Sequence, residues 1–199
     1  MFSFASKFPS SIFLPENITP FVYFNDIFNH DELHSLTKYC RSLETVKART
    51  TKNIENDDYR KTDIGRVILN SDTEFFYQRI SEIVVLLNSK SYDFELSGFY
   101  ENLDYLRYDS AEQAHFELHT DNVVFNQPGR KLSVVLQLSD PSEYEGGELQ
   151  IIMNKDPIKI PKNKGMLVIF PSYTVHKVTA VTRGVRETIV GWVTGPRFK

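Results

Sequence analysis

The chain has 199 residues, of which 41% are apolar, 25% charged and 13% aromatic, a composition typical of a folded globular protein. Its formal net charge of −3 argues against general nucleic-acid binding, which needs an excess of lysine and arginine. The single cysteine, Cys40, excludes an intramolecular disulfide, and no apolar run approaches the length of a membrane span. We therefore predict one cytoplasmic domain over residues 1–199, without a signal peptide and binding neither nucleic acid nor membrane. These patterns leave the oligomeric state open.

Two amphipathic helices are predicted in an N-terminal support region, about residues 1–90. Asn29 or Asp31 can cap the first helix, which then runs to about Ser42. Asp72 is predicted to cap the second helix. Its apolar residues recur at helical spacing: Phe75, Phe76, Ile80, Ile83, Val84 and Leu87. We interpret this stripe as hydrophobic core rather than as a cofactor-binding face.

Irregular and extended segments surround these helices. Residues 1–19 are an irregular lead-in punctuated by proline, and short strands are predicted at Phe21–Phe24 and Asp63–Leu69. The run 49–62 is polar and charged. Such a run is typical of a solvated connection, and also of a mobile lid over a site.

From Phe94 onward, short strands alternate with explicit turns such as Glu145-Gly146-Gly147. The predicted strands are Phe94–Glu101, Leu103–Tyr108, Ala114–His119, Lys131–Leu138, Glu148–Ile152, Pro157–Ile160, Met166–Phe170, His176–Val181 and Val185–Thr194. Many short strands at regular spacing indicate a closed two-sheet barrel of the jelly-roll kind. We predict a mainly β (α+β) fold with a jelly-roll core over about 94–195 and both N-terminal helices packed on one sheet.

The motif His119-Thr120-Asp121 is the first candidate metal site. A His and an Asp two residues apart project from the same side of an extended strand. One offers a neutral imidazole nitrogen and the other a carboxylate, which suits Fe(II) and related divalent metals. His176 is the best candidate for a third ligand. Together they would form a two-His, one-carboxylate facial triad that leaves coordination positions open.

A carboxylate-binding motif follows ten residues after His176. Arg186 and Thr188 share one face of a predicted strand with Trp192. An Arg with a hydroxyl two residues away can hold a carboxylate with two parallel N–H bonds and one further hydrogen bond. Taken alone, Arg186 is better explained by a surface charge pair. Beside a metal, the pair suits the far carboxylate of a dicarboxylic acid whose keto-acid end chelates that metal.

These residues together resemble the 2-oxoglutarate- and Fe(II)-dependent dioxygenases, specifically the prolyl 4-hydroxylase-like group. The resemblance covers about residues 60–195 and depends on Tyr108, His119, Asp121, His176, Arg186, Thr188 and Trp192 in that order. It implies a double-stranded β-helix with His119, Asp121 and His176 as the metal ligands. It also implies that Arg186 binds the C5 carboxylate of 2-oxoglutarate, supported by Thr188 and by a tyrosine, either Tyr108 or Tyr105.

The function implied by the resemblance is hydroxylation of an unactivated C–H bond, at a prolyl residue of a peptide or protein. Fe(II), 2-oxoglutarate and O2 are the implied cofactors, with ascorbate as a reductant, and the implied catalytic residues are His119, Asp121, His176 and Arg186. The alternatives are a hydroxylase of a free amino acid or other small molecule, and a non-catalytic metal-binding jelly roll. Strict alternation would place His115 and Glu117 beside His119, so the strand bulges there or these residues line the mouth of the site.

Overall fold

Two antiparallel sheets form the centre of the fold in the computed structural model, which describes residues 20–48, 58–122 and 129–197. The larger sheet has the order β1-β12-β8-β14-β6-β4-β2, and β5 and β9 also pair with β14. Its strands are β1 (Val22–Phe24), β2 (Val46–Lys47), β4 (Asp63–Val67), β5 (Gly98–Phe99), β6 (Leu103–Asp109), β8 (Gly129–Gln137), β9 (Tyr144–Gly146), β12 (Leu167–Pro171) and β14 (Val181–Gly195). The smaller sheet has the order β11-β10-β13-β7-β3. Its strands are β3 (Arg60–Lys61), β7 (His115–His119), β10 (Leu149–Ile151), β11 (Ile158–Lys159) and β13 (His176–Val178).

Two helices complete the described fold. In α1 (His30–Ser42) the Asn29 side chain accepts a hydrogen bond from the Glu32 backbone N–H. The Glu32 carboxylate accepts one from the Asn29 N–H, and this capping box selects Asn29 over Asp31 as the cap. The prediction that Asp72 caps α2 (Glu74–Ser91) was wrong, because Thr73 is the N-cap residue. The Asn70 side chain accepts from the Asp72 N–H, so a turn organised by Asn70 precedes the helix.

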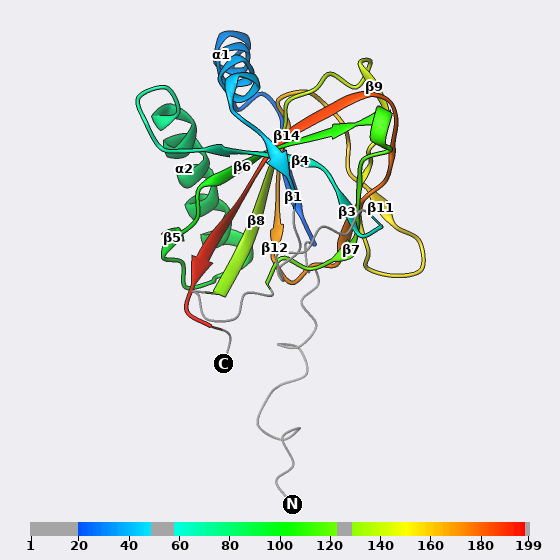
Figure 1. Cartoon of the computed structure of the whole chain (residues 1–199). Coiled ribbons are helices and arrows are strands. Elements are labelled where there is room, and N and C mark those ends of the chain that lie inside the picture. Colours follow the sequence, from blue (N-terminus) through cyan, green and yellow to red (C-terminus); the bar gives the residue numbers. More distant parts are fainter. Residues whose placement is uncertain (1–19, 49–57, 123–128, 198–199) are drawn as a thin grey trace, which may run out of the picture.

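Both helices pack on the outer face of the larger sheet, as predicted. Figure 1 shows them to the left of that sheet, with the smaller sheet on its right. The core between helices and sheet contains Leu36, Cys40, Phe76, Ile80, Val84, Leu103, Val134, Leu136, Ile189 and Val193. The helical stripe predicted for α2 is therefore core. No helix among the described residues is long and apolar enough to cross a membrane.

A second core fills the space between the two sheets. Its buried residues come from both sheets and include Leu106, Tyr108, Val135, Leu149, Ile151, Val168, Phe170 and Val178. Alternation along β14 separates the two cores, because Ile189 packs toward the helices and Val190 toward the smaller sheet. Residues an even number of positions from Val190 along β14, among them Arg186, therefore point into the interior of the barrel.

Several strands differ in extent from the sequence prediction. In the predicted strand Phe94–Glu101 only β5 is extended and paired, because the Asn88 side chain bonds both the N–H and the C=O of Phe94. Three short strands, β2, β3 and β9, were missed. Each has two or three residues, too few for an alternating pattern to appear. β14 begins four residues earlier than predicted and bends to pair with β9 as well as with β6 and β8.

One buried charge links α1 to the larger sheet. The Glu187 carboxylate, on the helix-facing side of β14, accepts hydrogen bonds from Arg41 Nε at 3.0 Å and from the buried Tyr105 hydroxyl. Burial raises the pKa of Glu187, but the hydrogen bonds from Arg41 and Tyr105 outweigh it, and the pKa lies below its usual value. This arrangement directs Tyr105 toward the helices, away from the barrel interior.

We predict that Glu187→Gln destabilises the fold by about 1–3 kcal/mol at pH 7, because a buried charged acceptor is lost. The half-exposed Arg41 places the expected value near the lower end. Since the folded-state pKa of Glu187 is depressed, its contribution is present above the unfolded pKa of about 4.3 and is lost as pH falls through the folded value. Urea unfolding from pH 7 to pH 3 measures this. Glu145→Gln, in an exposed pair with Arg183, is the control with little expected change.

Candidate metal centre and adjoining pocket

Three side chains predicted as metal ligands converge between the sheets. His119 ends β7 and His176 begins β13, and the two are direct partners across these strands. Asp121 follows two residues after His119. His119 Nε2 lies 3.7 Å from Asp121 Oδ1, and His176 Nε2 lies 3.6 Å from Asp121 Oδ2. One nitrogen or oxygen from each of the three lies within 4.8 Å of the others, a spacing that a single metal ion can bridge.

Backbone carbonyls orient both imidazoles. His119 Nδ1 lies 2.7 Å from the Glu117 carbonyl oxygen, and His176 Nδ1 lies 2.9 Å from that of Thr174. A carbonyl only accepts, so each Nδ1 carries the proton and each Nε2 presents its lone pair toward Asp121. Burial, and then the charge of His176, lowers the pKa of His119 to about 4. His119 is therefore neutral at pH 7, the form that ligates metals.

Asp121 is held by its own set of contacts. Its backbone N–H donates to the Ser172 carbonyl at 2.8 Å. The Ser133 hydroxyl donates to Oδ2 at 2.7 Å and lies 3.0 Å from the Ser172 hydroxyl. Burial raises the pKa of Asp121, but His176, His119 and the Ser133 hydrogen bond outweigh it, and the pKa is lowered. The side chain is thus an ionised carboxylate despite being buried.

A bulge in β7 decides which residues accompany His119. The partners of His176 and Val178 are His119 and Phe116, so β7 places one extra residue opposite β13. Phe116 consequently lies on the same side as His119, and their rings stack with centroids 3.5 Å apart. His115 instead lies near the carbonyl oxygens of Gln113 and Asp58, away from the three candidate ligands. The bulge, one of the two alternatives, is therefore correct.

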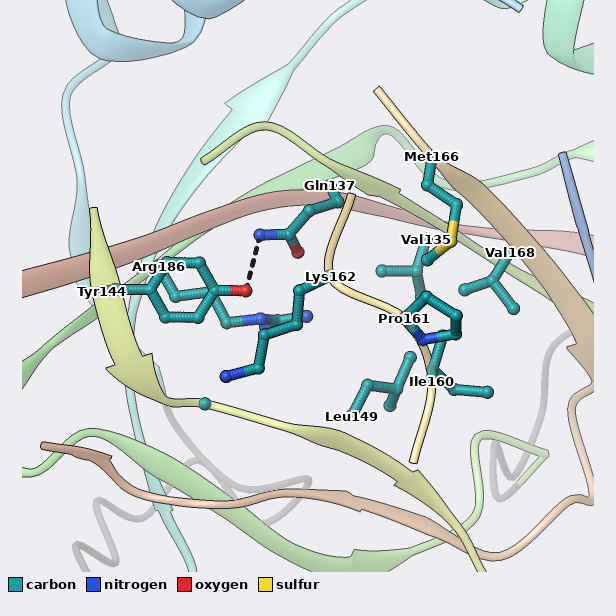
Figure 2. A pocket seen from close by; sticks show the side chains of 11 residues that line it. Val135, Gln137, Tyr144, Leu149, Ile160, Pro161, Lys162, Met166, Val168 and Arg186 are labelled. Carbon is teal, nitrogen blue, oxygen red and sulfur yellow. Dashed lines mark hydrogen bonds between the residues drawn. The ribbon is translucent and has the colours of Figure 1, made fainter. Parts of the chain in front are cut away.

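A pocket with Arg186 in its wall lies between the two sheets (Figure 2). It contains about 270 Å³ of empty space, part of it open to solvent. Its lining residues are Val135, Gln137, Tyr144, Gly147, Leu149, Ile160, Pro161, Lys162, Met166, Val168 and Arg186. Strand β8 connects the candidate ligands with this pocket. Its residue Ser133 contacts Asp121, and the next two residues on the same face of the strand, Val135 and Gln137, line the pocket. Alternate strand residues are about 7 Å apart, so the pocket lies one to two such steps from the candidate ligands.

Arg186 enters this pocket as a buried cation. Its guanidinium carbon lies 5.3 Å from the centre of the Tyr108 ring, and its side chain is beside Gly147. A Cβ on Gly147 would lie 2.9 Å from Arg186 Cδ, and the φ of +58° also disfavours other residues, so glycine is needed here. Of the two tyrosines left open by the sequence, Tyr108 is the one on the Arg186 side. Within residues 20–48, 58–122 and 129–197, no carboxylate forms an ion pair with Arg186.

Comparison with known proteins finds a family similarity. The 2OG-Fe(II) oxygenase superfamily matches residues 103–194, the segment that carries every candidate ligand and Arg186. This segment, a little under half of the chain, is similar to that superfamily. Among curated relatives, a PKHD-type hydroxylase of Prochlorococcus marinus is 42% identical over 84 residues, 42% of this chain and 38% of the relative. One from Hyphomonas neptunium is 40% identical over 90 residues, 42% of this chain and 39% of the relative. The chain thus spans about two fifths of the length of these relatives.

Solved structures show the same fold. A Pseudomonas putida prolyl-4-hydroxylase superposes with a TM-score of 0.71 at 18% identity, covering 89% of this chain and 94% of the other. A Trichoplax adhaerens prolyl hydroxylase, in complex with a hypoxia inducible factor peptide fragment, superposes with a TM-score of 0.74 at 16% identity, covering 88% and 83%. The predicted jelly roll with two supporting helices is confirmed.

The residues present fit the cofactors that the superfamily implies, Fe(II) and 2-oxoglutarate. Two imidazole nitrogens and one carboxylate are a donor set that Fe(II) accepts with positions left open. For 2-oxoglutarate, Arg186 offers two parallel donors that no described carboxylate occupies. The buried Thr188 hydroxyl, on the same face of β14, has no hydrogen-bond partner within the described part of the chain. Buried polar groups are rarely left unpaired, so these two residues point to a ligand.

Sequence reasoning missed other residues of the site. Ser133, Gln137, Tyr144 and Lys162 were not singled out as candidates. All four lie within the range of the family resemblance, about residues 60–195, which was the only available signal. Gln137 donates to the Tyr144 hydroxyl at 3.0 Å (Figure 2), a contact between two strands that spacing in one strand does not reveal.

We predict that Ser133→Ala lowers the affinity for Mn(II) or Fe(II) by about 10- to 100-fold, because Asp121 loses the hydrogen bond that orients it. Ser172→Ala should cost less, since the Ser172 hydroxyl contacts Asp121 only through Ser133. Calorimetric titration of metal into the apo protein measures both, with thermal unfolding of the apo forms as a control for folding. Equal affinities for wild type and Ser133→Ala would contradict this role.

Proposed function

We propose that the chain is a dioxygenase that uses Fe(II) and 2-oxoglutarate to hydroxylate an unactivated C–H bond. The observation that carries this is the pairing of two features in one barrel. One is the His119, Asp121 and His176 cluster with both Nε2 atoms directed at the carboxylate. The other is the buried Arg186 in the adjoining pocket, which no carboxylate of the described residues neutralises. A plain metal-binding barrel would not need the second feature.

In this proposal Fe(II) is held by His119 Nε2, His176 Nε2 and the Asp121 carboxylate. When bound, Fe(II) and 2-oxoglutarate would supply the activation of O2, with one oxygen atom ending in the succinate that forms as CO2 is lost and the other in the hydroxyl that replaces the substrate C–H hydrogen. The carbonyls of Glu117 and Thr174 keep both imidazoles in the ligating tautomer. Ser133 keeps the carboxylate turned toward them.

Arg186 would bind the far carboxylate of 2-oxoglutarate, with the Thr188 hydroxyl as a further donor and Tyr108 beside the guanidinium. A buried cation without a counter-charge raises the free energy of the folded state. The pocket therefore favours a ligand that places a carboxylate next to Arg186. The pocket walls at Val135, Leu149 and Val168 are apolar and would limit the water in contact with the co-substrate on that side. Strengthened by this low polarity, the Arg186 contact fixes the orientation of the ligand relative to the metal.

The substrate that we propose is a prolyl residue in a peptide or protein. The support is that the similar solved structures include a prolyl hydroxylase with a peptide fragment and a viral collagen prolyl hydroxylase. The described end of the predicted lid supports a substrate-facing role for that segment. Arg60 pairs with Phe116 across β3 and β7, and its guanidinium carbon lies 4.5 Å from the Phe116 ring centre. Residues 49–57 lie outside the described residues, so the lid stays a prediction.

Ascorbate, as a reductant for turnovers uncoupled from substrate, and a cytoplasmic location also stay predictions. The three catalytic ligands and Arg186 are assigned within the same proposal. Succinate formation, measured with prolyl peptides and with free amino acids, separates the peptide substrate from the small-molecule alternative. If only free amino acids stimulate succinate formation, the peptide assignment is wrong.

We predict that Asp121→Ala abolishes 2-oxoglutarate decarboxylation, because two imidazoles alone leave too few fixed ligands for Fe(II). His119→Ala and His176→Ala should do the same. Anaerobic Fe(II)/2-oxoglutarate titration, followed by the visible charge-transfer band, reports formation of the complex. Turnover with O2 reports decarboxylation. Wild-type decarboxylation by Asp121→Ala would show that the metal lies elsewhere.

We predict that Arg186→Ala binds metal normally but binds 2-oxoglutarate tens- to thousands-fold more weakly, about 2–5 kcal/mol. Arg186→Lys should fall between, because it keeps the charge and loses the two-pronged geometry. Thr188→Val should cost about 1 kcal/mol, the value of one neutral hydrogen bond. Calorimetry with Mn(II) as a redox-inert metal measures all three. Absence of 2-oxoglutarate binding by the wild type would favour the non-catalytic metal-binding barrel.

A further inference from the structure

A second cationic side chain, Lys162, lines the same pocket as Arg186. Lys162, between β11 and β12, is half-buried in the pocket wall, and Figure 2 shows its side chain beside those of Tyr144 and Arg186. Its Nζ donates to the Gly146 carbonyl at 2.6 Å and lies 4.8 Å from the centre of the Tyr144 ring. An ammonium group has three N–H donors, so this bond leaves two available.

The surroundings of Lys162 do not neutralise it. Among the described residues no carboxylate forms an ion pair with it, and Glu148, the acidic group that acts on it most strongly, pairs with Lys159 at 3.0 Å. Glu145 acts on Lys162 only at longer range. Arg186 and Lys159 add further positive charge around it. Two cations thus converge on one pocket wall without a protein counter-charge, which costs free energy unless a ligand supplies one.

We propose that Lys162 is a second recognition residue for the far carboxylate of 2-oxoglutarate, which it contacts from the open side of the pocket while Arg186 contacts it from the buried side. This inference rests on the proposed function and assigns a new residue to it. The Tyr144 ring lies beside Lys162 Nζ, and the Tyr144 hydroxyl is held by Gln137. The ring would therefore form a side wall of the space that the carboxylate occupies. Together the two cations select a dicarboxylic co-substrate over a keto acid with an apolar end.

Comparison of two ligands of equal length tests the contact directly. In 2-oxovalerate a methyl group replaces the far carboxylate of 2-oxoglutarate, and the metal-chelating end is unchanged. With Mn(II) bound, Lys162→Met should weaken 2-oxoglutarate about tenfold, the scale of a charge-assisted hydrogen bond discounted for partial exposure. It should change 2-oxovalerate affinity by less than about twofold. Met keeps the length and packing of the stem.

Two further variants serve as controls. Lys164→Met removes a charge two residues away that is exposed and outside the pocket lining, so it should leave both affinities unchanged. Lys162→Arg keeps the charge and should recover part of the 2-oxoglutarate affinity. If Lys162→Met disturbs folding in thermal unfolding, Lys162→Gln replaces it with the same expectation.

The outcomes separate this inference from the proposed function. Failure of the wild type to bind 2-oxoglutarate overturns the function and the inference together. If Arg186→Ala weakens 2-oxoglutarate binding and Lys162→Met does not, the proposed function stands and the inference is overturned. Equal losses of both ligands in Lys162→Met would show that Lys162 acts on pocket shape, which also overturns it. Selective loss of 2-oxoglutarate supports the contact.

Discussion

The alternation of side chains along β14 is the constraint on which the rest of the structure depends. This strand pairs with β6 on one side and with β8 on the other, and it separates the helix-facing core from the barrel interior. Adjacent residues of β14 therefore point to opposite faces of the sheet. Glu187 ties the sheet to α1 through Arg41, whereas Arg186 enters the pocket. A one-residue slip in register would exchange the two charges, placing a carboxylate in the pocket and an unpaired guanidinium among the helices.

Backbone geometry prepares the metal centre before any metal is considered. The direct pairing of His119 with His176 sets the spacing of the two imidazoles, and carbonyls two residues earlier in each case fix their tautomers. The bulge in β7 adds the Phe116 ring against His119. Burial keeps His119 neutral, while hydrogen bonding keeps Asp121 ionised. A site built from sheet pairings in this way is rigid, which suits ligands that must keep a fixed geometry.

Folding leaves several polar groups that face the barrel interior without a counter-charge or hydrogen-bond partner in the described structure. Arg186 and the Lys162 ammonium have no carboxylate partner in the described structure, and the Thr188 hydroxyl has no hydrogen-bond partner there, whereas Glu187 and Asp121 are each held by several donors. Unpaired buried donors reduce stability, and protein cores generally avoid them. These unpaired groups lower the stability of the folded protein, and binding of the proposed co-substrate would raise it again by pairing them.

The sequence by itself determined the class of fold, both helices with their packing faces, and the identity of His119, Asp121, His176 and Arg186 as the residues to examine. Local periodicity encodes the fold class and the helices, whereas the four residues were singled out by their spacing together with the family resemblance. Only the tertiary structure decided that Tyr108 and not Tyr105 accompanies Arg186, that β7 bulges, and that Ser133, Tyr144 and Lys162 join the site. Each of these depends on pairing between strands that are distant in the chain, and no local pattern specifies the register or the bulge that brings them together.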